Sequence, residues 1–128
     1  MDEKRVMVVD DESQIVKMYT KAFSKAGFVV QSATSAKQAL EMLPKKPSMV
    51  HFLDLFMPDM NGLELCRIVR KEWPMSICFA VTGHASLYEL TDLREAGFED
   101  FFLKPLSVSV LVETAKRAFE KIERWKER

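Results

Sequence analysis

The sequence predicts a doubly wound α/β fold, in which helices cover both faces of a five-stranded parallel sheet. Short continuous apolar runs alternate along the chain with longer stretches whose apolar residues recur at helical spacing. The short runs are typical of strands that are buried on both faces, and the longer stretches are typical of amphipathic helices. Strict alternation of the two implies parallel strands joined by right-handed helical crossovers, for which the doubly wound sheet is the common solution.

The first strand is predicted at Arg5–Val9, an apolar run that stops at Asp10. The helix that follows is predicted at 12–26 and ends before Gly27, a residue that readily adopts the backbone conformation of a helix C-cap. The second strand is predicted at 28–31. The buried side of the first helix is expected to be formed by Ile15, Tyr19, Ala22, Phe23 and Ala26.

The second helix is predicted to begin after Thr34 or Ser35, either of which can cap it, and to end near Leu43. Prolines mark the loop that follows. The third strand is predicted at 48–53 and ends at Asp54. This strand leads into a loop that is rich in turn-forming residues.

The third helix is predicted at 62–71, and its buried side at Leu63, Leu65, Cys66, Ile68 and Val69. The fourth strand is predicted at 76–81 and ends at Thr82. The fourth helix, at about 85–96, has only a thin apolar stripe, which consists of Leu87, Leu90 and Leu93.

The fifth strand is predicted at 99–103 and ends at Lys104. Ser107 can cap the last helix, which is predicted at about 107–126. Its apolar stripe is expected to consist of Leu111, Ala115, Ala118, Ile122 and Trp125.

The 128 residues are expected to form a single domain at 1–128, with a core at about 5–120. The 19 basic residues balance the 19 acidic ones, which gives no reason to expect direct nucleic-acid binding. No apolar run approaches the roughly 20 residues that a bilayer span needs, and the N-terminal apolar run is too short for a signal peptide. Cys66 and Cys78 are interpreted as reduced core thiols, without the spacing of a zinc site. We therefore expect a cytoplasmic protein that does not insert into a membrane.

Polar residues follow four of the predicted strands at their carboxyl ends, where doubly wound sheets bind ligands. These residues are Asp10 and Asp11, Asp54, Thr82, and Lys104. Clustered carboxylates repel one another and favour a bound divalent cation, and their hard oxygen ligands suit Mg²⁺. Asp54, at the end of the third, central strand, is the candidate nucleophile for an acyl phosphate, with Lys104 as the neutralising cation and Thr82 as the hydroxyl that binds a phosphoryl oxygen.

Each of these residues also has an ordinary structural interpretation. Asp10 or Asp11 can cap the first helix, Asp54 can be a turn residue, Lys104 can be solvated, and Thr82 can simply end a strand. Their joint occurrence at one edge of the sheet favours the phosphoryl-transfer hypothesis.

Four motifs together resemble the receiver domain of two-component response regulators, a chemotaxis-regulator-like protein with the flavodoxin-like fold. The resemblance extends from about Arg5 to the last helix. The motifs are Val-Val-Asp-Asp-Glu at 8–12, Leu-Asp-Leu-Phe-Met-Pro-Asp-Met-Asn-Gly at 53–62, Val-Thr-Gly-His at 81–84 and Phe-Phe-Leu-Lys-Pro at 101–105.

The resemblance implies that Asp54 accepts a phosphoryl group from a sensor histidine kinase, a histidine phosphotransfer protein or a small phosphodonor. It implies a Mg²⁺ ion bound by Asp11, Asp54 and the backbone carbonyl of Phe56, with Asp10 acting mainly through a water molecule. It also implies a cis peptide bond between Lys104 and the proline that follows.

The resemblance further implies that Thr82 and Phe101 form a switch pair. On phosphorylation they would change the surface of the fourth helix, fifth strand and fifth helix, which an output partner reads. The expected protein is a signalling switch rather than an enzyme, with only self-phosphorylation and autodephosphorylation activity. It is expected to be a monomer or a phosphorylation-dependent homodimer.

Several positions suggest properties of this particular chain. Phe56 is large and apolar, and with His84 it is expected to shield the acyl phosphate from water. Phe101 has no hydroxyl group with which to make a hydrogen bond. His51 is interpreted as a half-buried structural histidine that points away from the site. The basic segment at 121–128 is either a solvated end or a place where a partner or a second copy of the chain docks.

Three alternatives use related chemistry or the same fold. A phosphatase of the haloacid dehalogenase type needs a second aspartate two residues after the nucleophile, where Phe56 stands instead. A flavodoxin-like cofactor binder needs a phosphate loop rich in serine, threonine and glycine after the first strand, where the acidic residues at 10–12 stand instead. A degenerate receiver that serves only as an interaction module is disfavoured by the complete acidic set.

Overall fold

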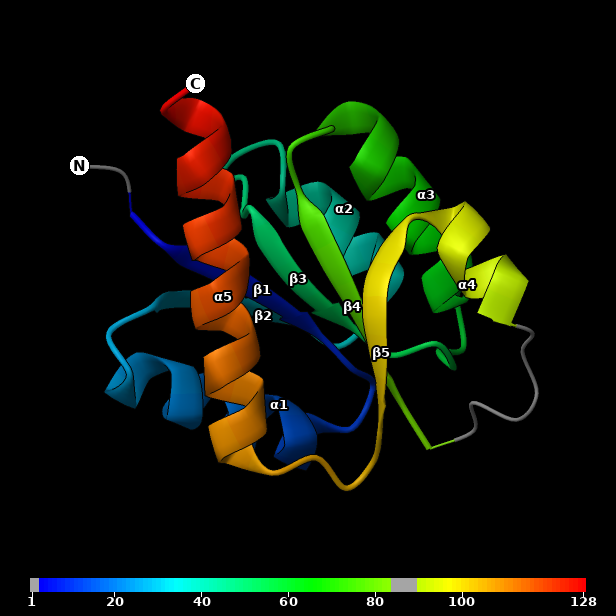
Figure 1. The fold of residues 1–128 in the computed structure, drawn as a ribbon. Helices are drawn as coiled ribbons and strands as arrows, with labels where there is room; N and C mark the ends of the chain where they lie inside the picture. Colours follow the sequence, from blue (N-terminus) through cyan, green and yellow to red (C-terminus); the bar gives the residue numbers. More distant parts are fainter. Residues whose placement is uncertain (1–2, 84–89) are drawn as a thin grey trace.

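The computed structural model describes residues 3–83 and 90–128. The expectations for His84 and Leu87 fall outside these residues. The described chain forms a five-stranded parallel sheet in the order β2-β1-β3-β4-β5, and helices cover both faces of the sheet (Figure 1). This architecture confirms the doubly wound fold that the sequence predicts.

The strands and helices alternate along the described chain as predicted. The strands are β1 (Arg5–Val9), β2 (Val29–Ala33), β3 (Val50–Leu53), β4 (Ile77–Thr82) and β5 (Phe98–Leu103). The helices are α1 (Ser13–Lys25), α2 (Ala36–Met42), α3 (Gly62–Glu72), α4 (Leu90–Ala96) and α5 (Val108–Lys126).

The two faces of the sheet bury separate apolar clusters. One cluster joins β1, β3 and β4 to α2, α3 and α4, and the other joins the opposite faces of these strands to α1 and α5. Alternate residues of a strand point to opposite faces, so continuously apolar strands supply both clusters. On the α1 and α5 face, Phe23, Phe52 and Phe79 pack in sequence, with neighbouring ring centroids 5.2 Å apart.

The strand register aligns the carboxyl ends of the inner strands. Val9 lies opposite Ala33 on one side and opposite Leu53 on the other, and Leu53 lies opposite Ala80. The residues that follow Val9 and Leu53 therefore emerge at one edge of the sheet.

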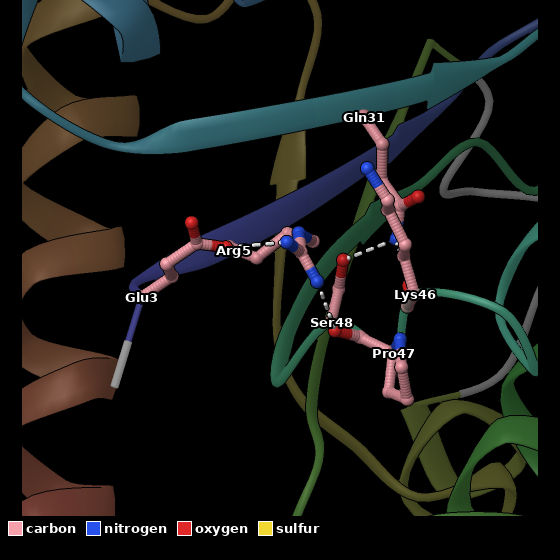
Figure 2. Close-up of polar contacts among 6 residues, drawn as sticks. All are labelled: Glu3, Arg5, Gln31, Lys46, Pro47 and Ser48. Atoms are coloured by element: carbon pink, nitrogen blue, oxygen red, sulfur yellow. Dashed lines mark hydrogen bonds and ion pairs between the residues drawn. The ribbon is translucent and has the colours of Figure 1, made fainter. Parts of the chain in front are cut away.

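A group of polar contacts lies at the opposite edge, around the loop that precedes β3 (Figure 2). The Arg5 guanidinium pairs with Glu3 and donates to the backbone carbonyl of Pro47 at 3.4 Å. The Gln31 amide donates to the Ser48 hydroxyl at 2.7 Å and to the backbone carbonyl of Lys46 at 2.5 Å. These contacts tie the loop to β1 and β2, far from the acidic carboxyl ends.

Four sequence-based predictions about burial are wrong. Ala26, expected on the buried side of the first helix, is exposed at the end of α1. His51 is fully buried rather than half-buried, and its Nε2 lies 2.7 Å from the Ser48 carbonyl oxygen. Leu90 and Trp125, predicted to belong to buried stripes, are 62% and 61% exposed. Phe119 is buried on α5, so the buried stripe turns away from Trp125 near the end of this helix.

The prediction of core thiols is confirmed, because Cys66 and Cys78 are both free of disulfide bonds and buried. Nowhere in the described part of the chain is a helix both long and apolar enough to cross a bilayer.

Candidate functional site

The backbone places three charged residues at the carboxyl edge of the sheet. The Asp10 amide donates to the Ala33 carbonyl at 3.2 Å, and the Asp54 amide donates to the Val9 carbonyl at 2.9 Å. The Lys104 amide donates to the carbonyl of Thr82 at 2.9 Å. These bonds continue the strand ladders by one residue, so the positions of the side chains follow from the sheet itself.

The ammonium group of Lys104 lies among carboxylates. Its Nζ is 2.8 Å from Asp10 Oδ2, 3.7 Å from Asp54 Oδ2 and 3.6 Å from Glu12 Oε1. Asp10 and Asp54 are almost fully buried, and only 16% of the Lys104 side chain is exposed. The structure therefore brings together charges from β1, β3 and β5 that lie far apart in the sequence.

Three consecutive carboxylates lie together beside the Lys104 ammonium. One carboxylate oxygen from each of Asp10, Asp11 and Glu12 lies within 4.8 Å of the others. Asp11 and Glu12 are exposed, whereas Asp10 is buried. With Asp54, the described residues of the site hold four carboxylates and one ammonium, that of Lys104. This excess of hard oxygen donors fits a divalent cation such as Mg²⁺.

The ionisation of Asp54 is opposed by its surroundings. Burial and the neighbouring Asp10 carboxylate raise the pKa of Asp54 from 3.8 to about 6, although Lys104 and the Phe56 amide act in the opposite direction. Burial acts to lower the pKa of Lys104, but the hydrogen bond and charge of Asp10, together with the charges of Asp54 and Glu12, outweigh it, so this pKa is raised. A bound cation would relieve the repulsion among the carboxylates.

The loop after β3 is held close to Asp54. The Phe56 amide lies 3.4 Å from Asp54 Oδ1, and the Gly62 amide donates to the Leu55 carbonyl at 3.0 Å. A Cβ atom on Gly62 would lie only 2.3 Å from the Asp54 carbonyl oxygen. Glycine is therefore required at the start of α3, because the helix begins against the backbone of the central carboxylate.

The proposed switch residues lie on one face of the sheet. Thr82 is fully buried at the end of β4, and Phe101 of β5 is partly buried against the cluster that includes Ala80. Ala80 pairs with Phe101, and Thr82 pairs with Leu103. Thr82 and Phe101 are thus diagonal neighbours across two paired strands. The Lys104–Pro105 peptide bond is cis, as the resemblance implies.

Three residues near the site were not singled out by the sequence. Glu12 reaches Lys104, and its place in an acidic run was the available signal. Tyr19 of α1 is buried, and the charges of Lys104 and the site carboxylates influence its pKa, which burial raises. Asp59 accepts hydrogen bonds from the start of α2, a contact that no local sequence pattern indicates.

Comparison with known proteins relates this chain and its fold to response regulator receiver domains. The profile of the response regulator receiver domain matches residues 6–116. The alginate biosynthesis transcriptional regulatory protein AlgB of Pseudomonas aeruginosa is 32% identical over 116 residues, which cover 91% of this chain and 26% of that protein. This chain spans about a quarter of the length of such curated relatives.

Solved structures give the same result. A CheY-like response regulator receiver domain protein from Methanospirillum hungatei has a TM-score of 0.91 and 28% identity, with coverage of 96% of this chain and 98% of that one. The chemotaxis protein CheY4 of Vibrio cholerae has a TM-score of 0.85 and 25% identity, with coverage of 91% and 99%.

Proposed function

The chain belongs to the response regulator receiver domain family, and from this membership we propose that Asp54 accepts a phosphoryl group from the phosphohistidine of a sensor histidine kinase or histidine phosphotransfer protein. As a receiver domain of a two-component system, it is a signalling module rather than a catalytic enzyme. Its own chemistry is then limited to accepting and losing the phosphoryl group.

One observation supports this proposal above the others. The Lys104 ammonium lies between Asp10 and Asp54 at the carboxyl edge of the sheet, 2.8 Å from the first and 3.7 Å from the second. An ammonium in this place neutralises charge on a phosphoryl group that is bonded to Asp54. It also holds Asp10 beside the acceptor.

The transfer itself exchanges one bond to phosphorus for another. A carboxylate oxygen of Asp54 bonds to phosphorus, and the bond from phosphorus to the kinase imidazole nitrogen breaks. The imidazole leaves with the bonding electron pair, and the product on Asp54 is an acyl phosphate. A small phosphodonor reacts in the same way, with its own leaving group in place of the imidazole. Hydrolysis of the acyl phosphate restores the carboxylate.

Mg²⁺ is the proposed cofactor, because receiver domains bind it and the donor set here fits it. We assign Asp11, Asp54 and the Phe56 carbonyl as direct ligands, and Asp10 as a ligand mainly through water. When bound, the ion supplies positive charge that offsets the charge of the phosphoryl oxygens. Lys104 supplies the second positive charge. Thr82 supplies the hydroxyl group that binds a phosphoryl oxygen.

The readout that we propose is a change of the surface formed by α4, β5 and α5. Movement of the Thr82 hydroxyl toward the phosphoryl group would open space that the Phe101 ring enters. Phe101 already borders a cavity of about 250 Å³ between α4 and β5, lined also by Leu90 and Leu93. A groove of about 830 Å³ separates β5 from α5. Exposed Leu90 and Leu103 give an output partner, or a second copy of the chain, apolar contacts on this surface.

Incubation with Mg²⁺ and a small phosphodonor tests the assignment of the acceptor. We expect intact-mass measurement to show the addition of one phosphoryl group to the parent protein and none to the Asp54→Ala variant. Asp100→Asn is the matched control, because it removes an exposed carboxylate of β5 and should leave phosphorylation unchanged. Equal modification of Asp54→Ala and the parent would show that the acceptor is wrong.

Beryllofluoride with Mg²⁺ tests the readout. Its complex with a carboxylate has the shape of an acyl phosphate, so the parent should show chemical-shift changes at Phe101 and along β5. Light scattering on the same sample distinguishes a monomer from a phosphorylation-dependent homodimer. Changes confined to the carboxyl edge of the sheet would contradict the proposed switching surface.

A further inference from the structure

Asp59 joins the loop after β3 to a different element of the fold. Its Oδ1 accepts a hydrogen bond from the Ala36 amide at 3.3 Å, and its Oδ2 accepts one from the Lys37 amide at 2.8 Å. The amides of Asp59 and Met60 also stabilise the carboxylate, and together these bonds lower its pKa. One exposed side chain therefore binds both its own loop and the start of α2.

These contacts complete the cap of α2. The first amides of a helix have no partner within the helix. The Ser35 hydroxyl accepts from the Gln38 amide at 3.1 Å, and Asp59 accepts from the two amides that precede it. A seven-residue helix is marginal alone, so α2 depends on such outside partners.

The same contacts complete a continuous series of hydrogen bonds between the segments that surround the acidic site. The start of α2 follows β2, and the Ala33 carbonyl at the end of β2 accepts from the Asp10 amide. Asp54, at the end of β3, is bonded through its amide to the Val9 carbonyl. Asp59 lies in the loop that carries Phe56, and its bonds connect this loop to the start of α2, which follows β2. Hydrogen bonds therefore connect Asp10, Asp54 and the loop after β3 to one another through β1, β2 and α2.

We infer that Asp59 is a positioning residue, which fixes the loop so that the Phe56 carbonyl and the Asp54 carboxylate are preorganised for Mg²⁺. The inference rests on the proposed Mg²⁺ site. Asp59 does not bind the ion, but acts through the backbone of its loop. Groups that orient a metal ligand typically contribute about tenfold or more to metal affinity.

Calorimetric titration with Mg²⁺ alone tests this role in three variants. Asp59→Ala removes both bonds to α2 and should weaken Mg²⁺ binding by about tenfold. Asp59→Asn removes the charge but keeps an acceptor oxygen, so its affinity should lie between those of Asp59→Ala and the parent. Ser35→Ala is the matched control: it removes the other cap of α2, lowers the urea midpoint, and should keep the Mg²⁺ affinity of the parent.

Amide hydrogen exchange of the metal-free proteins gives a second readout. Asp59→Ala should accelerate exchange at the amides of Phe56 and Gly62, whereas Ser35→Ala should not. Three outcomes overturn the inference: parent-like affinity in Asp59→Ala, an equal loss in Ser35→Ala, or an equal loss in the alanine and asparagine variants, which would indicate a pure charge effect. A parent protein that binds no Mg²⁺ would instead overturn the proposed function, and this inference with it.

Discussion

The imidazole of His51 is fully buried in β3, where it must remain neutral. Its Nε2 lies against the Ser48 carbonyl oxygen, and its Nδ1 has no partner among the described residues. Burial lowers the pKa of His51 from 6.5 to about 4. Protonation therefore introduces an uncompensated charge into the core.

Acid is expected to destabilise the protein through His51. Between pH 6.5 and about 4 the unfolded chain binds a proton that the folded chain does not, so stability is present above this range and is lost as the pH falls. The loss amounts to about 3 kcal/mol. Asp54 acts in the opposite direction: between about pH 6 and 3.8 its carboxylate binds a proton in the folded chain but not in the unfolded chain, so its contribution to stability increases as the pH falls.

Urea unfolding of the metal-free parent and a His51→Leu variant isolates this contribution, because both proteins retain Asp54. As the pH falls from 7 to about 4, the free energy of unfolding of His51→Leu should rise by about 3 kcal/mol relative to that of the parent. A difference that does not depend on pH would contradict the assignment of this titration to His51.

The Phe56 side chain is expected to slow hydrolysis of an acyl phosphate on Asp54. It is partly buried against the core cluster beside the acceptor. Phe56→Asn should admit water and accelerate autodephosphorylation by about tenfold, which corresponds to about 1.4 kcal/mol of activation free energy. Phe56→Leu keeps an apolar cover and should decay at a rate near that of the parent. Equal decay rates for Phe56→Asn and the parent would disprove this role.

At the scale of elements, the start of α3 is the most constrained junction near the site. Gly62→Ala would place a Cβ 2.3 Å from the Asp54 carbonyl oxygen and 2.9 Å from the Leu55 Cα. Both are backbone atoms of one buried segment and cannot move cheaply, so we expect a loss of about 3 kcal/mol in stability. Gly83→Ala is the control, since its Cβ would meet nothing within 4 Å. Similar thermal midpoints for the two variants would show that α3 can shift.

Hydrophobic periodicity predicted the positions of the helices and strands well, but it predicted the burial of individual side chains less well. The strand at Arg5–Val9 matches the prediction, because its apolar run has sharp polar ends. Leu90 and Trp125 continue an apolar pattern, but both side chains are mostly exposed. Periodicity identifies the side of a helix that faces inward, but it does not show how far the neighbouring elements extend.

The candidate site shows the same division. Asp10, Asp54 and Lys104 follow predicted parallel strands, so topology alone brings them to one edge. The contacts of Asp59 with α2 depend on the path of a loop, which follows from packing rather than from local sequence. Sequence therefore predicted that these three residues lie at one edge of the sheet, but it did not indicate the contacts of Asp59.

At the scale of the whole molecule, the excess of carboxylates links stability to Mg²⁺ and pH. An ion that binds only the folded state stabilises it by about 2.7 kcal/mol at one hundred times the dissociation constant. We expect Mg²⁺ to raise the thermal midpoint near neutral pH. The shift should shrink below pH 6, because a proton on Asp54 competes with the ion. Differential scanning fluorimetry at neutral pH and at a pH below 6 measures the shift of the thermal midpoint on adding Mg²⁺. Ca²⁺ at equal ionic strength serves as a comparison. A shift that is independent of pH would contradict the role of Asp54 as a ligand.

The two tryptophans determine how such experiments can be observed. Trp73 is the C-cap of α3, and its carbonyl accepts a hydrogen bond from the Ser76 amide just before β4. The exposed Trp125 borders the same amino edge of the sheet. β4 extends from Ile77 to Thr82, about 16 Å, and separates this edge from the carboxylates. Intrinsic emission should therefore follow unfolding of the chain while it stays almost silent during a Mg²⁺ titration. Tryptophan emission that stays constant on adding Mg²⁺ is therefore expected even when the ion binds. A fluorescent group that reports binding of Mg²⁺ has to be introduced at the carboxyl edge of the sheet.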